Sequence, residues 1–200
     1  FLNIFPGSTR LNGMYNRCMA EGSIDIKLHS SFSDFDEEEW NRLAHESEAR
    51  GPFLQYGYLK SWWQYRGGGE WPKDSELFLL SFNKDSLAGI APFFHVNEDE
   101  SPTLYLLGAV EISDYLDLIG PQVIIDGMAS GFLRFLGQEA HHDIERIVLF
   151  NIPETSPTLP ALKNAADENG WDVKTERAYP APSISLPESW EGYLKKLEEK

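Results

Sequence analysis

The order of apolar patterns along the chain is the feature that most limits its fold. Segments with alternating apolar residues, typical of strands, are interspersed with segments whose apolar residues recur at helical spacing. Strands are predicted at 23–30, 76–82, 87–96, 103–108, 145–152, 171–178 and 181–186, and helices at 33–49, 58–63, 128–142, 157–169 and 188–200. Ser33 or Asp34 is the expected N-cap of the first helix, and Asp126 that of the third. This order predicts an α/β domain.

Composition and charge exclude several classes of protein. The chain is 42% hydrophobic and 13% aromatic, which is enough for a sizeable core. A net charge of −15 argues against nucleic acid or an anionic membrane as the main partner. The single cysteine, Cys18, excludes an internal disulfide or a zinc site built on cysteines. No apolar run is long enough to cross a bilayer, and we expect a cytoplasmic location.

The first eighteen residues differ from the rest. They contain Arg10 and Arg17, whereas all 32 acidic residues lie after them, and the chain begins with Phe1 instead of Met. They lack the apolar stretch of a signal peptide. Our hypothesis is that residues 1–18 are a non-native or upstream leader and that translation begins at Met19.

The stretch EISDYLDLIGPQVIID, residues 111–126, resembles a buried strand that polar residues interrupt. In an extended chain Tyr115 and Asp117 share one face, and Asp114 lies on the other. One interpretation is that these side chains line a groove, where a carboxylate binds hydroxyl or ammonium groups or acts as a base. In the other, Asp114 caps a turn and Asp117 pairs with an arginine or lysine.

Other candidate residues have weaker patterns. Trp63 could stack on a carbohydrate, but core packing is the favoured interpretation for both Trp62 and Trp63. Pro92 lies within a predicted strand, which suits a sheet edge, the opening of a splayed sheet, or a bulge. Glu139 and His142 have the i, i+3 spacing of metal ligands, but this pair, with His141 between them, is more typical of a solvated helix end. We therefore predict no metal site.

Six phrases in a fixed order carry a family resemblance: WNRLAHES, GPFLQYGYLKSWW, LAGIAPFF, YLLGAVEISDYLDLI, NIPETSPTLPAL and PAPSISLPESWEGYLKKLEEK. Together they resemble the N-terminal half of the GNAT acetyltransferases associated with cellulose and exopolysaccharide biosynthesis, which are tandem proteins similar in plan to the Fem-type aminoacyltransferases. The resemblance covers roughly residues 23–200. It implies a GNAT-like fold with a mixed central sheet and helices on both faces. Residues 19–187 would form the first GNAT-like domain, and residues 188–200 would begin the second.

The resemblance also implies a function. The whole protein would transfer an acyl group, expected to be acetyl, from acetyl-CoA to an amine or hydroxyl of a sugar or cell-envelope precursor. The first half would help to form the acceptor groove, where Asp114, Tyr115, Asp117 and Trp63 are the candidate substrate-binding residues. The second half would hold acetyl-CoA.

One departure from the family pattern concerns the donor loop. The family's R/Q-x-x-G-x-G/A motif is replaced by IGPQVIIDGMASG, in which bulky residues follow Gln122 and Asp126 would repel a phosphate. We therefore expect this fragment alone to bind no acetyl-CoA and to be inactive. Two alternatives remain: a catalytically silent carbohydrate- or peptide-binding module with the same fold, and a structural or dimerisation domain.

Overall fold

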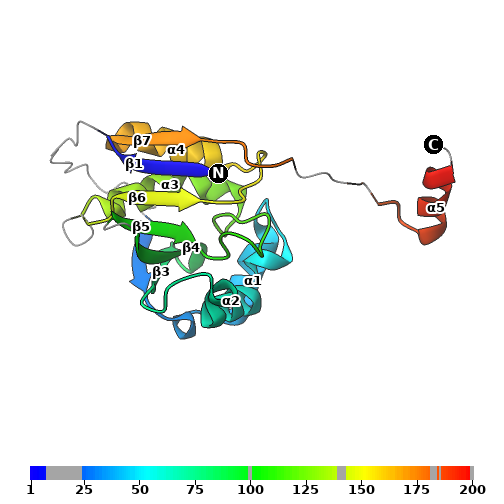
Figure 1. Cartoon of the computed structure of the whole chain (residues 1–200), viewed down its shortest axis with the longest axis horizontal. Coiled ribbons are helices and arrows are strands. Elements are labelled where there is room, and N and C mark those ends of the chain that lie inside the picture. Colours follow the sequence, from blue (N-terminus) through cyan, green and yellow to red (C-terminus); the bar gives the residue numbers. More distant parts are fainter. Residues whose placement is uncertain (8–23, 99–100, 139–142, 181–183, 185, 199–200) are drawn as a thin grey trace.

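The computed structural model describes residues 1–7, 24–98, 101–138, 143–180, 184 and 186–198. Within these residues the chain is a mixed α/β protein with one seven-stranded sheet, ordered β2-β3-β4-β5-β6-β1-β7, and five α-helices (Figure 1). The strands are β1 (Leu2–Pro6), β2 (Asp25–His29), β3 (Glu76–Asn83), β4 (Leu87–Glu98), β5 (Ser101–Leu106), β6 (Arg146–Leu149) and β7 (Trp171–Thr175). The helices are α1 (Glu37–Glu46), α2 (Tyr56–Gly69), α3 (Gln122–Leu136), α4 (Thr158–Asn169) and α5 (Trp190–Glu198).

Strand direction changes in the middle of the sheet. Strands β2 to β5 pair antiparallel. Strands β5 and β6 are parallel, and β1 is antiparallel to both of its neighbours. Because parallel neighbours need a long crossover, the chain leaves β5 and passes through α3 before it returns as β6. The carboxyl ends of β5 and β6 therefore lie at the same edge of the sheet.

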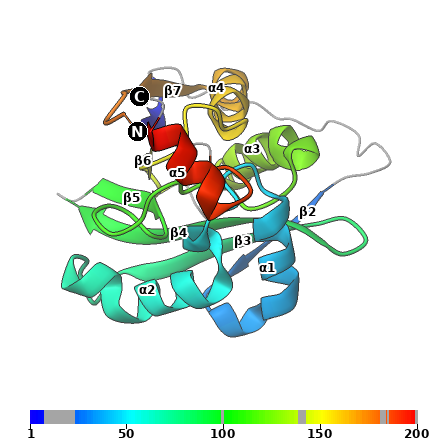
Figure 2. The same cartoon turned by 90° about the vertical axis from the view of Figure 1, so that its right-hand side faces the viewer.

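Helices cover both faces of the sheet (Figure 2), as predicted. Alternate residues of each strand point to opposite faces. Phe93 of β4 faces α3 and stacks on Phe132, with ring centroids 4.9 Å apart. Its neighbour Phe94 packs on the other side with Trp62 of α2. The sheet thus separates two apolar layers, one under α3 and α4 and the other under α1 and α2.

Helix boundaries differ from the predicted ones at two N-termini. Helix α1 is capped by Asp36, whose carboxylate accepts a hydrogen bond from the Glu39 N–H at 2.9 Å. The expected caps Ser33 and Asp34 lie instead in a short 3-10 turn before it. Helix α3 begins at Gln122, so Asp126 lies inside the helix and does not cap it. The apolar run 122–126 is therefore a helical turn and not the end of a strand.

Pro92 lies in an interior strand, so the edge position is excluded. Its carbonyl accepts a hydrogen bond from the Leu107 N–H at 2.8 Å, one residue beyond the end of β5. Paired residues of β4 and β5 begin at Phe93 and Leu106. Proline lacks the N–H that would complete this pair with Leu107, so one hydrogen bond is lost just beyond the paired residues of β4 and β5.

The N-terminal residues contribute a strand that the leader interpretation did not include. Leu2 and Ile4 of β1 are 1% and 0% exposed in the core under α3 and α4. The sequence analysis predicted no strand in these residues, so this strand of the sheet was missed. Residues 8–18 lie outside the described residues, and a start at Met19 remains a prediction.

The C-terminal residues contain the predicted last helix. Helix α5 lies apart from the rest of the molecule in Figure 1, and its side chains Trp190, Leu194 and Leu197 are exposed. Of the predicted strand 181–186, only Ile184 and Leu186 are described; they belong to no strand and are exposed. No helix in the described part of the chain is long and apolar enough to cross a membrane.

Candidate functional site

The segment 107–120, here called the edge loop, connects β5 to α3 at the edge where β5 and β6 both end (Figure 1). The prediction of a buried strand in this segment is wrong. Its only strand-like pairing is one bridge between Ile119 and Ile90. Leu116 and Leu118 are buried because the loop folds back onto the core under α3 and α4.

Helix α2 and the residues after it hold one side of the edge loop. The Trp71 indole N–H donates to the carbonyl oxygen of Ala109 at 2.7 Å. The Tyr58 hydroxyl lies 2.9 Å from the carbonyl oxygen of Ile112 and 2.8 Å from the hydroxyl oxygen of Ser113. The indole N–H of Trp71 and the hydroxyl of Tyr58 thus hold the backbone of the edge loop in place.

Asn151, two residues after β6, holds the other side of the edge loop. Its side-chain amide donates to the carbonyl oxygens of Val110 and Ser113, at 3.0 and 2.7 Å. Its own carbonyl accepts from the Leu116 N–H at 3.0 Å. Asn151 has a positive φ of 56°, which asparagine tolerates better than most residues. Sequence reasoning missed this residue, although an asparagine directly after an apolar strand is a recognisable turn signal.

Asp117 is a buried structural residue. It is 2% exposed, and its carboxylate accepts hydrogen bonds from the Ser156 hydroxyl at 2.6 Å and from the Leu118 N–H at 2.8 Å. Ser156 Oγ also accepts from the Thr158 N–H at 3.0 Å, at the start of α4. Asp117 is thus paired, as the structural interpretation proposed, but with a serine and not with an arginine or lysine. It connects the edge loop to α4.

Burial raises the pKa of Asp117, and the charge of Glu48 adds to this effect. The Ser156 and Thr158 hydroxyls and the Leu118 N–H favour the ionised carboxylate and partly oppose the rise in pKa. Ser156 has the larger effect of the two hydroxyls, because Thr158 Oγ1 makes no hydrogen bond of good geometry in the described part of the chain. A carboxylate enclosed in this way is not available to a substrate from solvent.

Asp114 and Tyr115 differ from Asp117 in exposure. Both are exposed, and Tyr115 has a positive φ of 54°. The expectation that Tyr115 and Asp117 share a face is therefore wrong, because the segment is not extended. The structure places Asp114 and Tyr115 on the outer surface of the edge loop and Asp117 beneath it.

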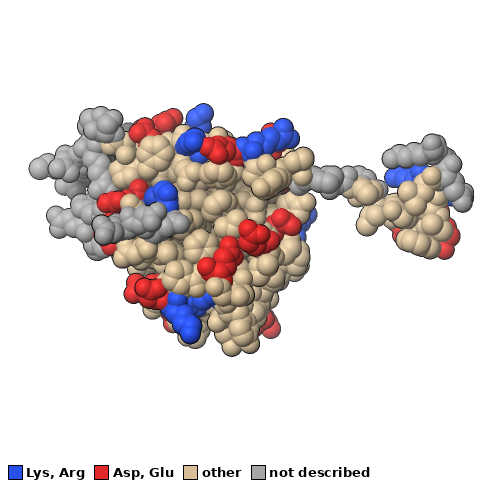
Figure 3. All heavy atoms as spheres, viewed as in Figure 1, with Lys and Arg blue, Asp and Glu red and all other residues tan. Residues whose placement is uncertain are grey.

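Two further carboxylates, Glu70 and Glu111, lie at the edge loop. Partial burial raises the pKa of Glu70, and the charge of Glu111 raises it further. The backbone N–H groups of Val110 and Glu111 act in the opposite direction. The face shown in Figure 3 carries both acidic and basic side chains among uncharged surface. Together with Asp114, Glu70 and Glu111 give the loop a negative potential that favours cationic or hydroxyl-bearing ligands.

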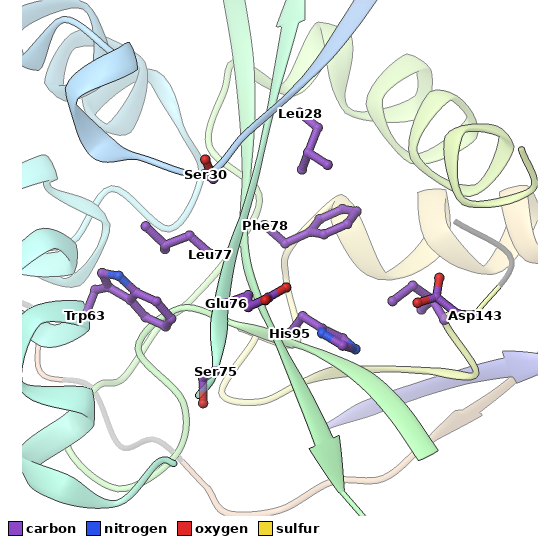
Figure 4. A pocket seen from close by; sticks show the side chains of 10 residues that line it. Leu28, Ser30, Trp63, Ser75, Glu76, Leu77, Phe78, His95 and Asp143 are labelled. Carbon is purple, nitrogen blue, oxygen red and sulfur yellow. The ribbon is translucent and has the colours of Figure 1, made fainter. Parts of the chain in front are cut away.

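Trp63 belongs to a different region. It lines an open hollow of about 600 Å³ with residues such as Glu76 and His95 (Figure 4). The Arg66 guanidinium carbon lies 3.5 Å from the centre of the Trp63 ring, so one ring face is already covered. His95 Nε2 is buried without a hydrogen-bond partner among the described residues. The Trp63 ring also packs on Phe94 of β4, with ring centroids 6.0 Å apart.

The described residues include no group of three or more His, Cys, Asp or Glu side chains that could hold a metal ion. Glu139, His141 and His142 lie outside the described residues. The start of α3 carries the exposed Val123 and the buried Ile124. These side chains flank the backbone N–H groups that a phosphate would have to approach.

Comparison with models of known protein families, with curated proteins and with solved structures finds no match. The fold, the hydrogen bonds of the edge loop and the sequence resemblance are therefore the basis for a functional proposal.

Proposed function

We propose that this chain is the acceptor-binding half of a GNAT-type acyltransferase and that the edge loop binds the acceptor. The observation that carries the proposal is the position of Asp114 and Tyr115. They are exposed on a loop that begins where parallel strands β5 and β6 end. In open sheets with parallel strands, ligands commonly bind beyond the carboxyl ends of the strands.

The loop has the two properties that an acceptor site needs. Hydrogen bonds from Tyr58, Trp71 and Asn151 fix its backbone, so a bound hydroxyl or amine would be held in one orientation. Its exposed carboxylates suit the hydroxyl or ammonium groups of a sugar or cell-envelope precursor. Glu70, with its raised pKa, is the candidate base for deprotonating such a group.

The donor would be acetyl-CoA, bound by a second GNAT-like unit. The start of α3 favours this division of roles, because Val123 and Ile124 occupy the place where a phosphate-binding loop would need glycine. The same feature favours the alternative, a silent binding module that holds a saccharide without chemistry. The two functions share the acceptor site and differ in whether transfer occurs.

An NMR titration of the ¹⁵N-labelled chain tests the acceptor site. With a short β-linked glucan and a short glucosamine oligomer as probes, we expect one of them to shift the amide signals of residues 111–116. Asp114→Asn should weaken that binding by roughly tenfold, as expected for a hydrogen bond to a charged group. The matched control is Asp167→Asn, an exposed aspartate on α4, which should leave the affinity unchanged.

Calorimetry with acetyl-CoA tests the division of roles. We expect no heat of binding for this chain, and micromolar binding would contradict the proposal. Absence of any saccharide-induced shift at residues 111–116 would contradict both the acyltransferase half and the binding module. Saccharide binding without acetyl transfer by the full-length native protein would favour the binding module.

A further inference from the structure

The open hollow of about 600 Å³ lies at the end of the sheet opposite to the edge loop (Figure 4). Asp143 and Ile144, which line it, precede β6, whereas the edge loop lies beyond the ends of β5 and β6. Glu76 lies at the start of β3, and His95 in the last part of β4. A ligand in this hollow would therefore be separate from a ligand at the edge loop.

The hollow has apolar walls because it continues the core under α3 and α4. Phe78 of β3 is 8% exposed and packs against Phe135 in the last turn of α3, with ring centroids 6.4 Å apart. Ile144 is buried in the same core. Leu28 of β2 also lines the hollow, but it is 41% exposed. A ligand with an apolar group would gain free energy by covering this leucine.

Two carboxylates line the hollow beside these apolar side chains. Glu76 and His95 are directly paired across β3 and β4, so their side chains lie on the same face of the sheet as that of Phe78. Asp143 is the second carboxylate. Both are exposed, and neither forms an ion pair or a hydrogen bond with a residue that the structure describes. Both carboxylates are therefore free to accept hydrogen bonds from a ligand.

The imidazole of His95 is a third acceptor in the hollow. Neither of its ring nitrogens has a hydrogen-bond partner among the described residues, and Nε2 is buried. Because Nε2 is buried, Nδ1 is the nitrogen that a ligand can reach. In the neutral ring with its proton on Nε2, Nδ1 accepts a hydrogen bond. His95 thus suits a ligand that donates.

The charges around the hollow favour a cation. Its described lining residues include two carboxylates but no lysine or arginine, so an anion would be repelled. The described residues contain no group of three or more His, Cys, Asp or Glu side chains that could hold a metal ion. An organic ammonium ion suits these side chains better, because it donates three hydrogen bonds and can carry an apolar group.

We propose that this hollow binds a primary ammonium ion that carries an aromatic or aliphatic group. Glu76 and Asp143 bind the ammonium group, and His95 accepts a hydrogen bond from it. Leu28 and Phe78 contact the apolar group. This site is additional to the acceptor site at the edge loop and does not depend on it.

An NMR titration of the ¹⁵N-labelled full chain with phenethylamine tests the proposal. We expect shifts of the amide signals of residues 76–78, 94–96 and 143–144, with a Kd on the order of 1 mM for a ligand of this size. Phenethyl alcohol, in which a hydroxyl replaces the ammonium group, should bind roughly tenfold more weakly. Ethylamine, which lacks the ring, should also bind at least roughly tenfold more weakly. Equal binding of phenethylamine and either analogue overturns the proposal, as do shifts that occur only outside the hollow.

A charge-removing variant tests the role of Glu76. Glu76→Gln keeps the size of the side chain and should weaken phenethylamine binding roughly tenfold. The matched control is Glu168→Gln, an exposed glutamate on α4, which removes the same charge far from the hollow in the sequence and should leave the Kd unchanged. An equal loss of affinity in both variants would indicate attraction by the net charge of −15 alone and would overturn the proposal, as would no loss in Glu76→Gln. The signals of residues 111–116, read in the same spectra, report on the edge loop separately.

Discussion

Asp114 and Asp117 are three residues apart, yet their surroundings are opposite. Asp114 is exposed on the edge loop, whereas Asp117 lies beneath it and accepts a 2.6 Å hydrogen bond from Ser156. The pKa of Asp117 is raised by burial, so its neutral form is favoured in the folded protein relative to the unfolded chain. The ionisation of Asp117 therefore affects stability, whereas the carboxylate of Asp114 is exposed to ligands in solution.

Replacement of Asp117 should reveal this difference. Asp117→Ala leaves the Ser156 hydroxyl proton and the Leu118 N–H without their acceptor and should lower the free energy of unfolding by about 2 kcal/mol. The side-chain amide of Asp117→Asn can still hydrogen-bond to Ser156 and to the Leu118 N–H, so this variant should cost less than about 1 kcal/mol at neutral pH. Urea denaturation measures both changes. Asp167→Asn on α4 is the exposed control and should change the free energy of unfolding by less than about 0.5 kcal/mol.

The same residue predicts a pH dependence. The pKa of Asp117 is higher in the folded than in the unfolded state. Between these two pKa values, the carboxyl group is protonated in the folded protein and ionised in the unfolded chain. The contribution of this proton to the free energy of unfolding is complete at a pH below the ordinary pKa of aspartate. It is lost as the pH rises through the raised pKa of Asp117 in the folded protein. Wild type should therefore lose stability in this interval relative to Asp117→Asn. Parallel curves for the two proteins would contradict the raised pKa.

The sequence did not identify the partner of Asp117, for which an arginine or lysine was one expectation and which the structure shows to be Ser156. A polar residue in an apolar run indicates that a partner is needed. It does not identify the partner, because Ser156 is far away in the chain and is brought close only when α4 packs on the sheet. Asn151 was missed for the same reason.

At the scale of elements, periodic segments were predictable and the edge loop was not. The β3–β4 pair and the end of α4 at Asn169 agree with the sequence pattern, and the helices on both faces agree with what the resemblance implies. The edge loop resembles a strand because Leu116 and Leu118 are apolar at alternate positions. Its shape depends on distant contacts with α2 and Asn151, so local periodicity misled the prediction.

Gly108 gives the edge loop a conformation that other residues rarely adopt. Its φ is 102°, and an added Cβ would lie 2.6 Å from Leu116 Cδ2. Gly108→Ala should lower the free energy of unfolding by about 2 kcal/mol through backbone strain and this contact. Thermal unfolding followed by circular dichroism measures the change. Gly57→Ala in α2 is the control, since nothing lies within 4 Å of its added Cβ; it should be neutral or stabilising. Equal losses would contradict a special role for Gly108.

At the scale of the whole molecule, the excess of negative charge is the main electrostatic feature. The net charge of −15 should oppose compaction through repulsion between like charges. Raising the ionic strength from about 0.01 M to about 0.15 M shortens the screening length and should raise the melting temperature at pH 7. Near the sequence pI of about 4.6 the effect should largely disappear. A salt effect of equal size at both pH values would point to specific ion binding instead.

The position of β1 also has a consequence for how the chain folds. Leu2 pairs with Thr175, so the contact spans nearly the whole sequence and raises the contact order of the sheet. β1 precedes the other described strands in the sequence, so it cannot pair until β6 and β7 have been synthesised. We therefore expect sheet completion to be the slow kinetic step of folding, with the earliest synthesised strand among the last to be incorporated.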